Sequence, residues 1–304
     1  MIDPRQSTAE GALLQDPGTR GSMRAIRNGA TAITMVALML GTTAAAEKKE
    51  FKYNVGSGAM VSVVNPFGPI TVKGVPGRQV VIVAIPSSDK VEVDCSQAGN
   101  RVTARTQLLQ RVGESEGRVE YEVTVPQDSI VTVRSATGPV HAERLRGDLT
   151  VEGDAAQVEV RDVSNAHVHV RTVNGAVTLE NISNGHVEIT SVGGNVRLNS
   201  VSGPKVYVNT ARGTIRYAGD FGGGGDYLLN NHSGDIEVWL PTTASVDITA
   251  QSIKGSVEQD FPLRQKQHTS FVPSPGRSFA GTSHDGASSV RLRSFSGKIR
   301  VKKQ

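Results

Sequence analysis

Three histidines recur at a spacing that could bring them together on one surface. His167 and His169 stand in "HVHV", His186 follows His167 by 19 residues, and Glu188 comes two residues later. Imidazole and carboxylate groups are ligands of zinc and copper, so such a cluster could bind a metal. The alternative is a solvated polar face, on which histidine is as acceptable as threonine. We expect the polar face, and therefore no metal and no other cofactor.

Two arginines repeat at the same spacing, Arg197 in "NVRL" and Arg216 in "TIRY". On neighbouring strands these like charges would repel each other, and the pair would suit an anionic partner. Glu237 is the next member of the series and could instead neutralise the pair. Both interpretations stay open, and we treat the two arginines as a candidate contact surface together with the three histidines.

A polar, proline-bearing segment at residues 259–287 carries three further basic residues, Arg264, Lys266 and Arg277. Long irregular segments on a rigid scaffold often bind partners, and often they are simply disordered. The composition of this segment suits docking more than chemistry. These three residues therefore complete the set of candidate contact residues.

Metal-binding and nucleotide-binding motifs are missing from the sequence. It contains no "HExxH", no paired-cysteine zinc spacing and no phosphate-binding loop. Some β-helices cleave polysaccharides with acids and bases on an outer face, but they need a cleft. The turns between residues 135 and 217 are too short to wall a cleft, and the acids do not converge. We predict a protein that is not an enzyme; the alternative is a polysaccharide-acting β-helix enzyme.

The elements that must position these residues follow from an internal repeat. Six four-residue turns end in glycine, with gaps of 19, 19, 21, 21 and 42 residues, at Gly175, Gly194, Gly213, Gly234, Gly255 and Gly297. After most of them, polar and apolar residues alternate, which is typical of strands, and a second such series lies half a period out of phase. Self-similarity at about 20 residues indicates a solenoid. The sequence therefore predicts an all-β, parallel β-solenoid of 19–21 residues and two short strands per coil.

This register assigns side chains to columns that run from coil to coil. One outer column is expected to contain Asp148, His167, His186 and Lys205. A column on the opposite outer face is expected to contain Glu159, Thr178, Arg197, Arg216 and Glu237. Val168, Val187 and Val206 should stack inside, where a continuous aliphatic interior holds the coils together.

The first 46 residues look like a targeting region. Residues 23–46 run from basic to apolar to small side chains, the order of a secretory signal peptide, with cleavage expected before Glu47. Residues 1–22 do not fit a signal and are interpreted as a non-native or misassigned extension. The apolar run is short for a membrane span of about 20 residues, so membrane contact is expected only through an uncleaved signal segment.

The exported part divides into two regions. Residues 47–134 are strand-rich but irregular, and we expect them to form an N-terminal β region that caps the first coil. Residues 135–304 hold the repeats, with residues 259–287 as an irregular excursion. The final "KIRVKKQ" is expected to close the other end of the solenoid with lysines.

Composition narrows the function classes further. The chain has 304 residues, a net charge of +4 and only 4% aromatic residues, without a basic stripe interleaved with aromatics. We therefore expect no nucleic acid as a partner. Cys95 is the single cysteine, so the protein has no internal disulfide, and "KVEVDCS" favours a plain strand residue at this position.

Several stretches resemble a known family. They are "NPFGPITVKG", "YEVTVPQDSIVTVRSATGPVHAERLRGDL" and "SSVRLRSFSGKIRV", and together with the repeats they span residues 51–303. They resemble the bacterial "putative adhesin" family of exported domains with short β-strand repeats and unknown function. The resemblance implies surface contact and, for some relatives, an association with envelope stress; the family carries no defined catalytic residues. With the signal-like segment at residues 23–46, we expect a periplasmic or other cell-envelope location. We therefore expect a non-enzymatic exported cell-envelope protein that presents a rigid β-solenoid surface to an envelope protein, a glycan or another envelope component.

Overall fold

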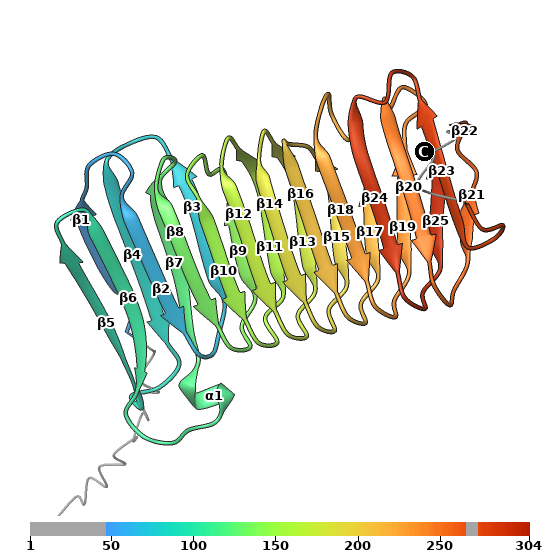
Figure 1. The fold of residues 1–304 in the computed structure, drawn as a ribbon. Helices are drawn as coiled ribbons and strands as arrows, with labels where there is room; N and C mark the ends of the chain where they lie inside the picture. The colour runs from blue at the N-terminus through green and yellow to red at the C-terminus, as the bar shows by residue number, and fades with distance from the viewer. Residues whose placement is uncertain (1–46, 266–272) are drawn as a thin grey trace, which may run out of the picture. The chain divides into compact units, whose positions relative to one another are not determined.

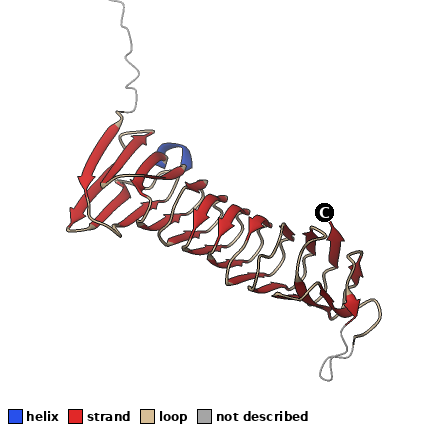
Figure 2. Ribbon diagram, turned by 90° about the horizontal axis from the view of Figure 1, so that it is seen from above, coloured by secondary structure: helices blue, strands red, loops and turns tan. Residues whose placement is uncertain are grey.

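The computed structural model describes residues 47–265 and 273–304, and they form two long β-sheets that face each other (Figure 1). Short strands account for most of these residues (Figure 2). The helix α1 (Glu114–Gly117) has one turn. Within the described ranges, no helix is long and apolar enough to cross a membrane. The predicted extension, the predicted signal peptide and Lys266 lie outside the described residues.

Sheet A contains twelve strands, and most neighbours in it are parallel. In spatial order they are β1 (Lys49–Asn54), β4 (Gln79–Pro86), β7 (Val119–Pro126), β3 (Ile70–Val75), β9 (Val140–Glu143), β11 (Val158–Ser164), β13 (Val177–Ser183), β15 (Val196–Val201), β17 (Ile215–Ala218), β19 (Ile236–Leu240), β25 (Ile299–Lys303) and β21 (Val257–Gln259).

Sheet B contains thirteen strands with the same alternation of inward and outward side chains. In spatial order they are β22 (Arg264–Gln265), β23 (Ser278–Ser283), β20 (Val246–Ser252), β24 (Ser288–Ser294), β18 (Asp226–Asn231), β16 (Lys205–Thr210), β14 (His186–Ser191), β12 (His167–Thr172), β10 (Leu149–Gly153), β8 (Ile130–Ser135), β2 (Met60–Asn65), β6 (Arg101–Leu108) and β5 (Val91–Ala98).

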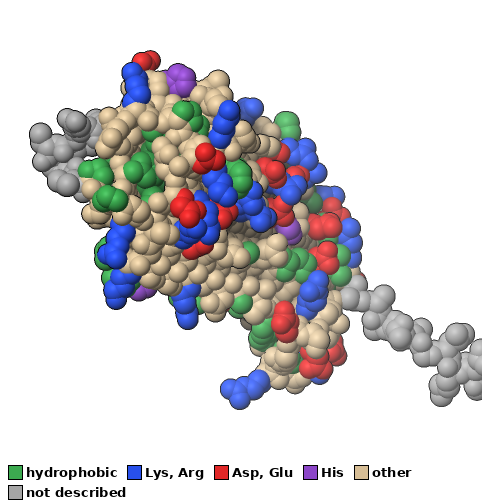
Figure 3. All heavy atoms as spheres, turned by 90° about the vertical axis from the view of Figure 1, so that its right-hand side faces the viewer, with side chains coloured by type: hydrophobic (Ala, Val, Ile, Leu, Met, Phe, Trp, Pro, Cys, Tyr) green, Lys and Arg blue, Asp and Glu red, His purple; other side chains and the backbone are tan. Residues whose placement is uncertain are grey.

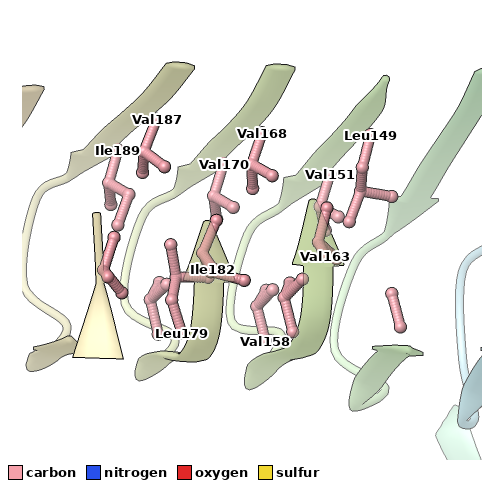
Figure 4. Close-up of a cluster of buried hydrophobic side chains, with 14 of the residues drawn as sticks. Leu149, Val151, Val158, Val163, Val168, Val170, Leu179, Ile182, Val187 and Ile189 are labelled. Atoms are coloured by element: carbon pink, nitrogen blue, oxygen red, sulfur yellow. The ribbon is translucent and has the colours of Figure 1, made fainter. Parts of the chain in front are cut away.

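The interior is a stack of aliphatic layers between the two sheets. Val168 pairs with Val187, and Val187 pairs with Val206, so the predicted inner column is present. All three are almost completely buried. Figure 4 shows how Val187 and Ile189 of sheet B face side chains of sheet A across the same interior. The prediction of a parallel β-solenoid with two short strands per coil is confirmed.

A repeated turn joins sheet B to sheet A in each coil. Its first residue is a buried serine, threonine or asparagine, and in most coils its side chain accepts a hydrogen bond from the glycine N–H three residues later. The distances are 3.1 Å from Gly194 N to Ser191 Oγ and 2.8 Å from Gly297 N to Ser294 Oγ. These bonds satisfy a buried backbone donor in each turn, which explains why the four-residue pattern recurs.

The N-terminal region continues the sheets and adds antiparallel neighbours. β1 and β7 both pair antiparallel with β4, and β5 pairs antiparallel with β6. A buried polar chain supports this end: Thr106 Oγ1 lies 2.9 Å from Asn65 Oδ1 and 3.0 Å from the hydroxyl of Tyr121. Cys95 lies half-buried in β5, and burial raises the pKa of its thiol to about 12.

The C-terminal coil occupies an interior position. β24 pairs with β18 on one side and β20 on the other, and β25 likewise lies between β19 and β21 (Figure 1). The expectation that "KIRVKKQ" closes the end of the solenoid is therefore wrong. The repeat predicts which side chains face inward. It does not predict the order in which the coils stack, because the surfaces through which they stack are alike.

The described part of the 259–287 segment builds the C-terminal edge. β23 pairs antiparallel with β20 along six residue pairs, and β22 adds two pairs to β23. Edge strands this short limit the number of unpaired backbone groups that another chain could join. This segment therefore has a structural role in addition to any contact role.

The glycine-rich loop before β18 is packed rather than free. Phe221 is buried and stacks on Tyr217, with ring centroids 4.2 Å apart. Ser288, which arrives from the C-terminal coil, donates to the carbonyl of Gly222 at 2.7 Å and accepts from Gly224 N at 3.1 Å. The loop thus fastens the interior C-terminal coil to the coil before it.

Candidate functional site

The histidine column lies on the outer face of sheet B. His167 pairs with His186, which pairs with Lys205, as predicted. The two imidazole rings are 5.2 Å apart in an edge-to-face arrangement, and His167 N donates to Asp148 Oδ1 at 2.9 Å. His169 lies in the next column beside Glu188. The described residues contain no group of three or more histidine, cysteine, aspartate or glutamate side chains placed to hold a metal ion.

The arginine pair lies on the outer face of sheet A. Arg197 of β15 pairs in register with Arg216 of β17, and both side chains are exposed. Thr178 and Glu237 flank the pair in the same column, as the spacing predicted. Neighbouring strands are about 4.8 Å apart, so the two like charges are held close together.

The acids near this pair are bound to other arginines. Glu237 Oε1 lies 3.0 Å from Arg300 Nη1, which also contacts Asp235 Oδ2 at 3.0 Å. Acidic and basic side chains lie intermixed in this way on the face seen in Figure 3. Neither Arg197 nor Arg216 forms an ion pair with any residue in the described ranges; Glu237 is the neighbour of Arg216 in the column, but it forms its ion pair with Arg300.

The arginine pair borders a shallow hollow of about 290 Å³. We call it the arginine hollow; its polar lining residues are Thr178, Asn195, Arg197, Thr214, Arg216 and Glu237. Asn195 Oδ1 accepts a hydrogen bond from Thr214 N at 2.9 Å, which directs the amide carbonyl of Asn195 to the backbone. Its NH₂ group has no hydrogen-bond acceptor in the described part of the chain.

Of the two arginines, Arg216 packs against the ring of a tryptophan, Trp239. The guanidinium carbon of Arg216 lies 5.3 Å from the centroid of the Trp239 ring, and Lys302 Nζ lies 4.8 Å from the same ring. Such cation–π contacts hold a cation against the sheet without a carboxylate partner. The contact therefore limits the freedom of Arg216 and leaves its charge uncompensated.

The basic residues of the 259–287 segment are separated from this pair in the sequence and serve the C-terminal edge. Arg264 of β22 donates to the carbonyl of His284, and Arg277 donates to the carbonyl of Ile253 at 3.5 Å. Both side chains are exposed, but each contacts backbone of its own end of the solenoid. The role proposed for Lys266 stays a prediction, because it lies outside the described residues.

A further surface, which the sequence interpretation missed, follows the repeated turns. It is a groove of about 530 Å³ that crosses five successive coils, those of β14, β16, β18, β24 and β20. We call it the edge groove. Its lining consists of Thr190, Ser191, Val192, Asn209, Thr210, Ala211, Asn230, Asn231, His232, Ile253, Arg293, Ser294 and Phe295.

The two walls of the edge groove differ in chemistry. One is the column of Asn209, Asn230 and Arg293, with amide and guanidinium groups. The other is formed by turn residues and is mostly apolar, with the ring of His232 stacked on that of Phe295. On the apolar wall, Val192 is 40% exposed and Ile253 is 56% exposed. The sequence signal was present: the residue after the buried first residue of each turn is often apolar, yet it has no inward position to occupy.

The sequence was compared with protein families and the structure with solved structures. The sequence matches the family described as Toastrack DUF4097 over residues 68–302. No curated protein matches it. Its similar solved structures include a "putative cell adhesion protein" from Clostridium sporogenes, with 13% identity, a TM-score of 0.27, and coverage of 85% of this chain and 100% of that chain. They also include a "putative adhesin" from Bacteroides fragilis, with 12% identity, a TM-score of 0.33, and coverage of 85% and 97%.

Proposed function

This chain belongs to the Toastrack DUF4097 family, and from its fold and surfaces we propose a non-enzymatic, exported cell-envelope protein that acts by contact. The edge groove carries this proposal. It crosses five coils, a length of roughly 20 Å at the ordinary strand spacing, and it is open along the surface. Such a groove suits an extended polymer of the envelope, because solenoids recognise partners with surfaces that span several repeats.

The distribution of ionisable groups is consistent with contact rather than turnover. Outward acids and histidines of the described residues lie in columns along the two sheets, and many of the acids are bound to arginines, as Glu237 is to Arg300. General acid–base catalysis requires a pair of groups positioned around one reacting bond. We therefore assign no catalytic residue to the protein.

Export is part of the proposal and rests on the sequence of residues 23–46. The mature protein is expected to begin near Glu47 and to reside in the periplasm or elsewhere in the envelope. Intact-mass measurement of the protein from its native host tests this expectation. A cytoplasmic product that retains Met23 contradicts it.

Cross-linking in intact cells tests the contact function. Val192→Glu combined with Ile253→Glu places two charges on the apolar wall of the edge groove. Leu109→Glu is the matched control, because Leu109 is 60% exposed and lies outside the groove. The double variant is expected to lose the cross-linked envelope component and the control to retain it, with equal thermal stability of both. Equal capture by both variants argues against the groove, and hydrolysis of an envelope polysaccharide by the purified protein supports the enzymatic alternative.

A further inference from the structure

The arginine hollow keeps two positive charges together, and the one carboxylate in its lining, that of Glu237, forms its ion pair with Arg300 at 3.0 Å. Arg197 and Arg216 are paired in register, and like charges directly opposite on adjacent strands destabilise a sheet. A second acid of the same sheet, Glu180, contacts Arg161 at 3.2 Å. The two guanidinium groups thus have no ion-pair partner in the described residues, and they can bind a ligand.

Apart from Glu237, the other polar side chains at the hollow are neutral. Thr178 and Thr214 contribute hydroxyl groups, and Asn195 contributes the NH₂ group of its side-chain amide. The oxygen of the same amide accepts a hydrogen bond from Thr214 N. Arginine offers several N–H donors in a planar fork that matches phosphate and carboxylate oxygens. The hollow therefore combines donors on two adjacent strands with an excess of positive charge.

We propose that the arginine hollow binds a phosphate group borne by a component of the cell envelope. Two guanidinium groups, one amide and two hydroxyls can donate hydrogen bonds to more than two oxygens. A carboxylate has only two oxygens, but a phosphate or phosphodiester has enough to contact both arginines at once. The contact of Arg216 with Trp239 limits the side-chain entropy that binding would cost. This inference names the chemistry of one partner of the proposed contact function; it uses sheet A and does not depend on the edge groove.

Binding assays with purified full-length protein test the proposal. The probes are inorganic phosphate, soluble polyphosphate, phosphatidylglycerol–phosphatidylcholine vesicles, pure phosphatidylcholine vesicles and polygalacturonate as a carboxylate polymer. Inorganic phosphate is expected to shift the side-chain Nε–H NMR signals of Arg197 and Arg216. Polyphosphate or the anionic vesicles should bind more tightly than polygalacturonate, and binding should weaken as salt rises.

A charge-matched pair of variants separates this site from net charge. Arg197→Gln with Arg216→Gln should weaken binding of the phosphate probes about tenfold or more. Arg105→Gln with Arg171→Gln removes the same charge from exposed residues of sheet B and should change binding less than about threefold. Arg197→Lys with Arg216→Lys, which keeps the charge, should bind at an intermediate level, and thermal melts verify that all variants fold.

The outcomes decide both the site and the source of the phosphate. Vesicle binding without polyphosphate binding assigns a lipid headgroup, and the reverse assigns a soluble or polymeric phosphate. Equal losses in the two double variants, no shift at the two arginines, or equal binding of polygalacturonate would overturn the proposal. If the protein does not bind the phosphate probes but still forms the cross-link at the edge groove, only the phosphate proposal is contradicted. The two proposals can therefore be tested independently.

Discussion

Gly194 lies so close to the carbonyl oxygen of Gly175 that a Cβ atom on it would stand 1.8 Å from that oxygen. The same contact recurs between neighbouring coils; the distance is 1.8 Å for Gly213 over Gly194 and 1.9 Å for Gly297 over Gly234. The repeated glycines are thus required by the close approach of one backbone to the next. A side chain here can be accommodated only if the coils separate.

The first prediction concerns this contact. Gly194→Ala should destabilise the protein by roughly 3 kcal/mol or more, because the new methyl group overlaps backbone that cannot rotate away. Gly223→Ala is the matched control, since no atom lies within 4 Å of a Cβ at that position. Chemical denaturation of both variants measures the difference. Similar midpoints would show that the coils separate easily.

The second prediction concerns the aliphatic interior. Val187→Asp should destabilise the protein by several kcal/mol, because an unpaired carboxylate would lie between stacked aliphatic layers. Thr178→Ala, on the outer face, should cost about 0.5 kcal/mol or less. Thermal melts compare the two variants. Equal effects would mean that the assignment of inner and outer faces is wrong.

The third prediction contrasts two arginines of one column. Arg300→Gln should lower stability by roughly 1 kcal/mol, because Arg300 contacts Asp235 and Glu237 in a partly buried position. Arg197→Gln should be neutral or slightly stabilising, because it removes repulsion from Arg216 and breaks no ion pair. Denaturation at low salt measures both changes. A larger loss for Arg197→Gln would show that this arginine has a stabilising contact.

The fourth prediction concerns alkaline pH. Burial raises the pKa of Cys95 to about 12, and burial also raises the pKa of Tyr217, with further contributions from Tyr227 and Asp220. The unfolded chain loses these protons near pH 9 to 10, whereas the folded chain keeps them, so stability is full below pH 9 and falls as pH rises beyond it.

Melting temperatures between pH 7 and pH 11 test this dependence. Tyr217→Phe should melt lower at pH 7, because the hydroxyl donates to the carbonyls of Val201 at 2.7 Å and Asp220 at 2.9 Å. Its melting temperature should decline less steeply with pH than that of the wild type. Parallel curves for the two proteins would exclude Tyr217 as a source of the alkaline loss.

The spacing of the repeat predicted the columns well, because a parallel ladder without insertions keeps residues 19 apart in register, as with His167 and His186. It could not predict which acid each arginine contacts. Glu237 follows Arg216 in its column, yet it bonds to Arg300, which arrives from the C-terminal coil. That contact depends on the spatial order of coils, and the gap of 42 residues between Gly255 and Gly297 is equally compatible with either order.

The edge groove was missed for a related reason. Alternation within a strand separates inner from outer side chains, but it says nothing about turn residues such as Val192 and Ile253, which belong to neither face. Only the stacking of turns from five coils turns isolated exposed residues into a surface.

Because β24 and β25 lie at interior positions, the strands of this protein cannot assemble in the order in which they follow along the chain. β20 and β21 precede in the chain the strands that must separate them from β18 and β19, and so they become available for folding first. During that interval, β20 can dock directly on the free edge of β18, with the same inward alternation but without its final neighbour. Correct assembly then requires this premature coil to detach so that the last-made residues can enter. We expect a slow final folding step that truncation before Ser288 abolishes, and a prematurely docked chain as the main misfolded species.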